Sequence, residues 1–172
     1  MNVGFISLGC SKNLVDTEMM IGIFKENEFN IVNNPKIADV IVINTCGFIE
    51  SAKEEAINTI LEMAEYKKTG RCKVLIATGC LVERYKEDLE KALPEVDIFL
   101  KYSDYSEEKG NSSVVFAKVL KEVYDKIIKQ IPNKIIEMLP DKPENLLRYA
   151  TRIKEVQFSK NVDEPTKKLM KE

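Results

Sequence analysis

The chain has 172 residues, of which 44% are hydrophobic, so it is long enough to form one domain of ordinary size around a single core. Its 26 basic and 28 acidic residues leave a formal net charge of −2, so we do not expect nucleic acid as a partner, and there is no general attraction to anionic membranes. No apolar run approaches the roughly 18 residues that span a bilayer, and the first residues lack the features of a secretory signal, so we expect a cytoplasmic protein.

The first part of the chain alternates between short apolar runs and amphipathic segments. Residues 3–8 predict a strand, and residues 14–24 carry apolar side chains at helical spacing, with Asn13 as the expected N-cap. Residues 29–32 predict a short edge strand. Residues 40–43 are β-branched throughout, which is typical of a strand buried on both faces of a parallel sheet.

The alternation continues to about residue 101. Ser51 and Glu54 form a capping-box pattern that predicts the start of a long helix, and Gly70 is its expected end. A strand, a shorter helix and a fifth strand are then expected over residues 73–77, 83–93 and 96–100. The order β-α-β-β-α-β-α-β predicts an α/β fold, a doubly wound, flavodoxin-like parallel sheet of about five strands in the order 2-1-3-4-5.

The character of the sequence changes after Leu100. Residues 101–113 are polar and predict a linker, whereas residues 114–131 carry apolar side chains at every fourth position, as expected of an amphipathic helix. The remaining residues are rich in proline and charge. We therefore divide the chain into an N-terminal domain of residues 1–101 and a C-terminal helical extension, residues 102–172, that consists of a linker, the helix and a divergent tail.

Three of the four cysteines follow the ends of predicted strands. Cys10, Cys46 and Cys80 each lie between a strand and the helix after it. Neighbouring strands of a sheet are about 4.8 Å apart, and the carboxyl ends of parallel strands share one edge, so the three thiols are expected to face a common space. Cys72 begins the strand that Cys80 ends and is expected at the opposite edge, roughly 26 Å away.

Three converging thiols predict a metal or iron–sulfur site. The chain has no histidine, which removes the commonest zinc ligand and every Ser/His or Cys/His catalytic pair. A [4Fe–4S] cluster is the better fit, because its irons take cysteine thiolates and three ligands would leave one iron open. The alternatives are that the thiols are ordinary buried core residues, or that they form a redox or persulfide carrier without metal.

The segments around these cysteines closely resemble the N-terminal domain of the radical-SAM methylthiotransferases. The segments concerned are GCSKNLVD at residues 9–16, NTCGFIESAKEE at residues 44–55 and TGCLVERY at residues 78–85. Their residues are similar to those of the RimO branch, whose members modify an aspartate of a small-subunit ribosomal protein. The resemblance covers residues 1 to about 100.

The resemblance implies a [4Fe–4S] cluster bound by Cys10, Cys46 and Cys80, whose open iron binds the sulfur species to be donated. In complete members of the family, a following domain holds a second cluster through a Cys-x3-Cys-x2-Cys motif and cleaves S-adenosylmethionine to a radical. No cysteine follows Cys80 here, so this chain lacks that motif. We therefore expect the sulfur-donor domain of a ribosomal protein aspartate methylthiotransferase, truncated before the radical-SAM domain, without catalytic residues of its own and inactive alone.

The resemblance also defines the expected partners. S-adenosylmethionine would be used only through the missing radical-SAM domain, which a separately encoded subunit could supply, and a small-subunit ribosomal protein is the expected family substrate. The alternative function is a non-catalytic, flavodoxin-like interaction module, or a gene remnant, in which the thiols are idle.

Overall fold

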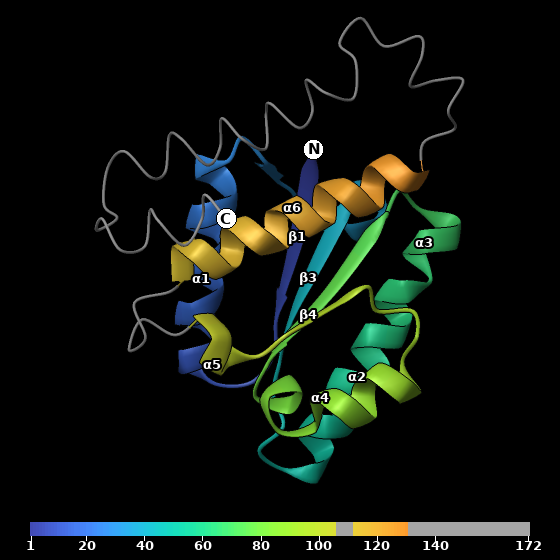
Figure 1. Cartoon of the computed structure of the whole chain (residues 1–172). Coiled ribbons are helices and arrows are strands. Elements are labelled where there is room, and N and C mark those ends of the chain that lie inside the picture. Colours follow the sequence, from blue (N-terminus) through green and yellow to red (C-terminus); the bar gives the residue numbers. More distant parts are fainter. Residues whose placement is uncertain (106–111, 131–172) are drawn as a thin grey trace, which may run out of the picture. The chain divides into compact units, whose positions relative to one another are not determined.

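One parallel sheet organises the first part of the chain (Figure 1), as seen in a computed structural model that describes residues 1–105 and 112–130. The strands lie in the order β2-β1-β3-β4-β5, and all neighbours run parallel. Their bounds are Asn2–Ser7 for β1, Asn30–Ile31 for β2, Val40–Thr45 for β3, Val74–Gly79 for β4 and Ile98–Leu100 for β5. The α/β class and the flavodoxin-like strand order expected from the sequence are confirmed.

Helices connect these strands and continue after the last one. The helices are α1 (Ser11–Glu26), the 3₁₀ helix η1 (Pro35–Ile37), α2 (Glu50–Ala64), α3 (Tyr66–Thr69), α4 (Cys80–Ala92), α5 (Tyr102–Tyr105) and α6 (Ser112–Gln130). The amphipathic helix expected near residues 114–131 is thus present as α6. The proline-rich tail expected after it lies outside the described residues. Among the helices that the structure describes, none is both long and apolar enough to cross a bilayer.

The chain divides into two units, Met1–Phe116 and Ala117–Glu172, and the first contains the whole sheet. Within this unit, helices cover both faces of the sheet. On one face the rings of Phe5 in β1 and Phe24 in α1 meet edge to face, with centroids 5.4 Å apart. On the other face Ile43 of β3 packs in one core with Ile60 of α2 and Leu89 of α4. The sheet is therefore doubly wound, which explains why all six residues of β3 are buried.

Two expected helix N-caps were wrong. Helix α1 begins at Ser11 with Cys10 as its N-cap, and no side chain caps it. Asn13 lies inside the helix, is 1% exposed and uses its amide for other buried partners. Helix α2 begins at Glu50 with Ile49 as its N-cap, so Ser51 lies inside the helix and does not cap it. Each helix begins a few residues after a strand, at a residue other than the one that local capping preference favours, and neither start has a side-chain cap hydrogen bond.

Several helices also differ in extent from the prediction. The long helix expected to end at Gly70 is divided at Glu65 into α2 and α3, and Gly70 is the C-cap of α3. Helix α4 begins at Cys80 itself, three residues before its expected start. Residues 102–105, expected in a linker, form the short helix α5, whereas residues 106–111 lie outside the described part of the chain.

Candidate functional site

The three predicted site cysteines follow three neighbouring strands at one edge of the sheet. Cys10 is the N-cap of α1 after β1, Cys46 directly follows β3, and Cys80 is the first residue of α4 after β4. Strand β3 pairs with both β1 and β4, and the last residues of β3 and β4, Thr45 and Gly79, lie opposite each other. The strands therefore end at a common level, and the structure brings the three cysteine segments together as the sequence predicted.

The cysteines at this edge are close enough to affect one another. The pKa of the Cys80 thiol is raised, first by burial and then by the negative charges that Cys46 and Cys10 would carry, while Lys12 opposes the shift. The turn before Cys10 also touches the second cysteine, because a Cβ at Gly9 would lie only 2.9 Å from Cys46 Sγ. All three thiols thus belong to one local site.

Cys72 is separate from this site. It precedes the start of β4 and is therefore at the opposite edge of the sheet, as expected from the sequence. Its thiol is buried and donates a hydrogen bond to the carbonyl oxygen of Val74 at 3.5 Å. Burial raises the pKa of Cys72 to about 11, so this thiol is neutral and poorly reactive at ordinary pH.

Cys10 has the opposite character. Its side chain is exposed, and the backbone N–H groups of Asn13 and Lys12 lower its pKa, because the first turn of α1 directs them toward the sulfur. The Lys12 ammonium lowers the pKa further. That ammonium also binds the Asp16 carboxylate at 3.0 Å and lies 3.4 Å from the centre of the Tyr102 ring. Cys10 is therefore an exposed thiol with a lowered pKa, whereas the pKa of Cys80 at the same edge is raised.

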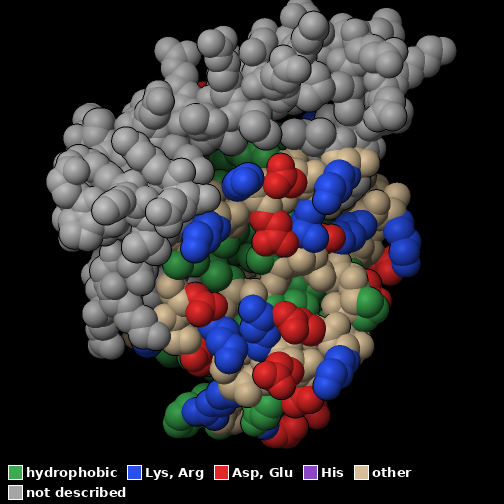
Figure 2. Space-filling model, in the orientation of Figure 1, with side chains coloured by type: hydrophobic (Ala, Val, Ile, Leu, Met, Phe, Trp, Pro, Cys, Tyr) green, Lys and Arg blue, Asp and Glu red, His purple; other side chains and the backbone are tan. Residues whose placement is uncertain are grey.

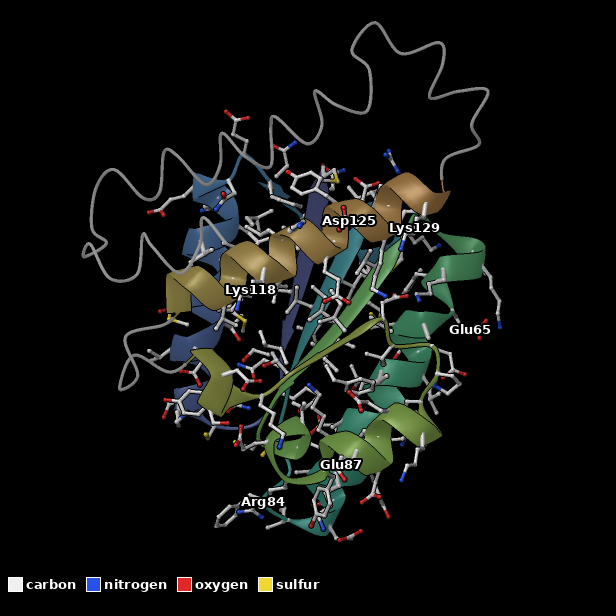
Figure 3. All side chains as sticks on the ribbon, viewed as in Figure 1. Glu65, Arg84, Glu87, Lys118, Asp125 and Lys129 are labelled. Carbon is white, nitrogen blue, oxygen red and sulfur yellow. The ribbon has the colours of Figure 1, made fainter. Side chains whose placement is uncertain are left out.

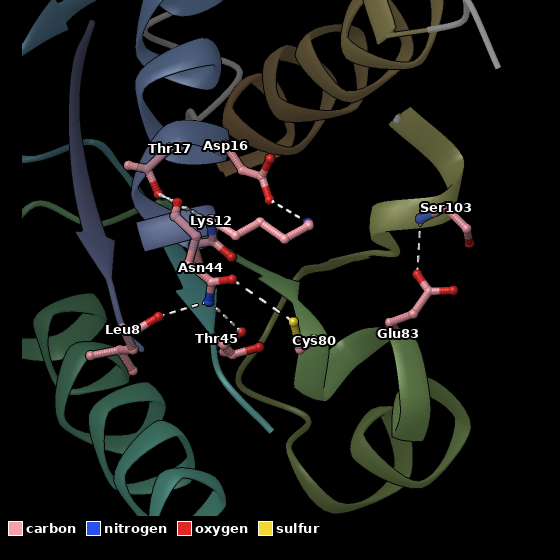
Figure 4. A network of polar contacts seen from close by, with 10 residues as sticks. Leu8, Lys12, Asp16, Thr17, Asn44, Thr45, Cys80, Glu83 and Ser103 are labelled. Atoms are coloured by element: carbon pink, nitrogen blue, oxygen red, sulfur yellow. Dashed lines mark hydrogen bonds and ion pairs between the residues drawn. The ribbon is translucent and has the colours of Figure 1, made fainter. Parts of the chain in front are cut away.

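A buried polar network that the sequence analysis did not identify lies under the cysteines (Figure 4). The Asn13 Nδ2 group donates to the carbonyl oxygens of Leu8 at 2.7 Å and Thr45 at 3.0 Å. The Cys80 thiol donates to Asn13 Oδ1 at a sulfur–oxygen distance of 3.8 Å. The sequence placed Asn13 at the start of a helix, but nothing local showed that its amide would serve strands distant in the sequence.

Asn44 forms the second layer of this network. Its Nδ2 group donates to the Asn13 carbonyl oxygen at 2.8 Å and to Thr17 Oγ1 at 3.1 Å. Asn44 Oδ1 is buried and has no hydrogen-bond partner among the described residues. It faces the Cα of Gly79, where a Cβ would overlap it and the Thr45 backbone. Gly79 also has φ of +96°, so both space and conformation require glycine before Cys80.

Apolar side chains are exposed around the same edge. Phe48 is 77% exposed and Ile49 is 58% exposed, and both follow Cys46 in the loop before α2. The guanidinium of Arg84 lies 5.8 Å from the centre of the Phe48 ring, and it projects from α4 at the lower end of Figure 3. Elsewhere on the face shown in Figure 2, acidic and basic side chains are interspersed. The loop beside Cys46 is therefore an apolar projection on an otherwise mixed surface.

The thiols at this edge are donors that both zinc and iron–sulfur clusters take. Within residues 1–105 and 112–130, no group of three or more Cys, Asp or Glu side chains is arranged to hold one metal ion. A zinc site needs its ligands around one centre, whereas the cysteines of a cluster bind different irons. Three neighbouring thiols, one of them exposed and inclined to ionise, have the chemistry that cluster irons take.

Comparison with known proteins identifies the family of the region that contains these cysteines. The family described as "Uncharacterized protein family UPF0004" matches residues 2–101. This chain belongs to that family. The UPF0004 region contains all five strands and the three cysteines at the carboxyl edge of the sheet.

Curated relatives of this UPF0004 region include several proteins named "Ribosomal protein uS12 methylthiotransferase RimO". The one from Alkaliphilus oremlandii (strain OhILAs) is 69% identical over 107 residues, which make up 62% of this chain and 24% of that protein. The one from Acetivibrio thermocellus (strain ATCC 27405) is 54% identical over 122 residues, or 71% of this chain and 25% of that protein. The chain thus spans about a quarter of the length of the curated relatives it matches. The resemblance to the N-terminal domain of the RimO branch is confirmed.

The close packing at Gly79 predicts a stability effect. We expect Gly79→Ala to lower the free energy of unfolding by about 2–4 kcal/mol, since the new methyl group overlaps Thr45 and Asn44 and φ is positive. Gly22→Ala is the matched control, because nothing lies within 4 Å of a Cβ there and the residue is inside α1; it should raise the free energy of unfolding by about 0.5–1 kcal/mol. Urea denaturation measures both, and equal effects of the two substitutions would contradict the account.

The different environments of Cys10 and Cys72 predict that their alkylation rates depend differently on pH. The thiolate is the form that iodoacetamide alkylates, so the alkylation rate rises as each thiol ionises. For Cys10 the half-maximal rate should fall below the ordinary pKa of 9.0, whereas buried Cys72, whose pKa is raised to about 11, should remain largely unalkylated at the pH of that midpoint. Mass spectrometry of peptides alkylated between pH 6 and 11 measures both residues in one sample. A common midpoint for Cys10 and Cys72 would show that the two environments do not differ as described.

Proposed function

We propose that this chain is the iron–sulfur, sulfur-donor domain of a ribosomal protein aspartate methylthiotransferase, with Cys10, Cys46 and Cys80 as ligands of a [4Fe–4S] cluster. The observation that carries the proposal is the placement of three cysteines at the carboxyl ends of the neighbouring strands β1, β3 and β4. The relatives named uS12 methylthiotransferase RimO support it, because they are up to 69% identical over this region.

The residues of the chain have distinct tasks in this proposal. When bound, the cluster would supply an iron that no protein ligand occupies and that can hold a sulfur species. Cys10 is exposed and inclined to ionise, which suits it to capture iron from solution. Cys46 is 9% exposed and holds the inner side of the site away from water. Gly9 allows the turn before Cys10 to approach Cys46 closely.

We propose that a protein segment outside this chain carries out the radical chemistry. The chain contains no Cys-x3-Cys-x2-Cys motif, so it does not bind the second cluster that cleaves S-adenosylmethionine and would be inactive alone. A radical-SAM domain or separately encoded subunit would therefore be the partner, and ribosomal protein uS12, named for the relatives, the eventual substrate. Modification of a ribosomal protein is consistent with a cytoplasmic location.

The exposed loop beside Cys46 supports a partner at this edge. Phe48 and Ile49 are the two consecutive apolar residues that a neighbouring domain would bury, and Cys10 lies exposed at the same edge. Burial of such residues stabilises an interface and at the same time excludes water from the site. We therefore propose that this loop contacts the radical-SAM partner.

Cluster binding tests the assignment of the ligands. After anaerobic reconstitution with ferrous iron and sulfide, the chain should hold about four irons and the broad visible absorbance of an iron–sulfur cluster. Cys10→Ala, Cys46→Ala and Cys80→Ala should each lose most of the iron, because a cluster with only two protein thiolates is easily released. Cys72→Ala is the control and should retain all of it. Equal iron in the triple variant and the unsubstituted chain would exclude the proposed ligands and favour the interaction module with idle thiols.

A domain exchange tests the methylthiotransferase assignment. Residues 1–101 of this chain replace the matching region of the Alkaliphilus oremlandii protein, and mass spectrometry measures methylthiolation of uS12. The chimera should be active, because the two regions are 69% identical. Phe48→Ser in the chimera should lower the activity roughly tenfold through a weaker domain contact, whereas Leu61→Ser, at an exposed position of α2, should not. An inactive chimera that nevertheless binds its clusters would contradict the assignment.

A further inference from the structure

One buried side chain connects all three cysteine segments. Asn13 is 1% exposed, and both hydrogens of its amide are used inside the protein. One is donated to the carbonyl oxygen of Leu8, at the end of β1 and two residues before Cys10. The other is donated to the carbonyl oxygen of Thr45, the residue before Cys46.

The amide oxygen of Asn13 reaches the third segment. The Cys80 thiol donates to Asn13 Oδ1 at 3.8 Å, so the sulfur itself is held by the side chain that holds the other two segments. A rotated amide would place its oxygen against the Leu8 and Thr45 carbonyl oxygens, and this repulsion fixes the orientation. A single amide thereby determines where three stretches of chain lie relative to one another.

Asn13 is itself held by a second set of hydrogen bonds. Its carbonyl oxygen accepts from Asn44 Nδ2 and from Thr17 Oγ1, both at 2.8 Å. Asn44 and Thr17 are also linked, at 3.1 Å, and all three residues are buried. Because buried networks with satisfied donors are rigid, Asn13 cannot easily move away from the cysteine segments.

A second asparagine of the same helix provides a comparison. Asn27, the C-cap of α1, is 3% exposed, and its Nδ2 group donates to the Ile23 carbonyl oxygen at 2.7 Å. Asn27 thus stabilises only its own helix end, whereas Asn13 connects separate strands. The two residues have similar burial and the same chemistry but differ in what they hold together.

We propose that Asn13 is a positioning residue that fixes the mutual placement of Cys10, Cys46 and Cys80, and that this placement is what admits the iron–sulfur cluster. The claim about the iron–sulfur cluster rests on the proposed function, whereas the claim that Asn13 positions the three cysteines does not. A substitution of Asn13 that preserves folding but removes both amide hydrogens should therefore displace the three thiols.

The first experiment compares Asn13→Ala with Asn27→Ala in the metal-free chain. Iodoacetamide alkylation at a fixed pH is followed for each cysteine by mass spectrometry, and buried Cys72 reports global opening. Loss of two buried hydrogen bonds should let the edge open locally, so in Asn13→Ala the rates of Cys46 and Cys80 relative to Cys72 should rise about tenfold or more. In Asn27→Ala these ratios should not change. Unchanged ratios in Asn13→Ala would overturn the proposal.

The second experiment measures iron and sulfide after anaerobic reconstitution. Asn13→Ala should lose most of the iron, whereas Asn27→Ala should keep it. If the unsubstituted chain binds no iron, the proposed function fails while the alkylation ratios still test the positioning of the thiols. If Cys72 in Asn13→Ala reacts as in an unfolded chain, Asn13→Ser, which retains one donor, is measured instead and should give a smaller change in the same direction. Full iron content in a folded variant at position 13 would contradict the proposed effect on the cluster.

Discussion

The parallel register of β1, β3 and β4 is the constraint on which the candidate site depends. Each strand end carries a cysteine into the following helix, and the strands end level because Thr45 is opposite Gly79. Burial of the sheet on both faces fixes this register, since a shift by one residue would exchange the two sets of packed side chains. The hydrophobic core therefore determines where three distant sulfurs can meet.

The three thiols at this edge of the sheet differ in their exposure and in their contacts. Cys10 is exposed and has a pKa lowered by the backbone N–H groups of Asn13 and Lys12, whereas Cys46 is buried and Cys80 is held by a buried amide. A symmetrical set of exposed thiols would be open to oxidation, and a fully buried set would be closed to iron. The observed combination is one exposed, one half-buried and one buried thiol. Under the proposed function, iron from solution would reach this site through Cys10.

Much of the fold and the position of the site could be predicted because both depend on local patterns. The β-branched run of β3 and the helical spacing in α1 are visible in the sequence, and parallel topology then brings Cys10, Cys46 and Cys80 to one edge. The role of Asn13 could not be predicted, because its acceptors at Leu8 and Thr45 are backbone atoms that only the assembled sheet brings near. Local propensity instead favoured Asn13 as a helix N-cap, in which its side chain would bond to the backbone of its own helix. The structure shows that its amide has other partners.

The most direct test of the central claim is an anaerobic crystal structure of the reconstituted chain. We expect one iron–sulfur cluster at the carboxyl ends of β1, β3 and β4, with Cys10, Cys46 and Cys80 as its protein ligands and Asn13 still bridging the Leu8 and Thr45 carbonyl oxygens. Electron density without a cluster at this edge, or with the three sulfurs directed into separate parts of the interior, would contradict it.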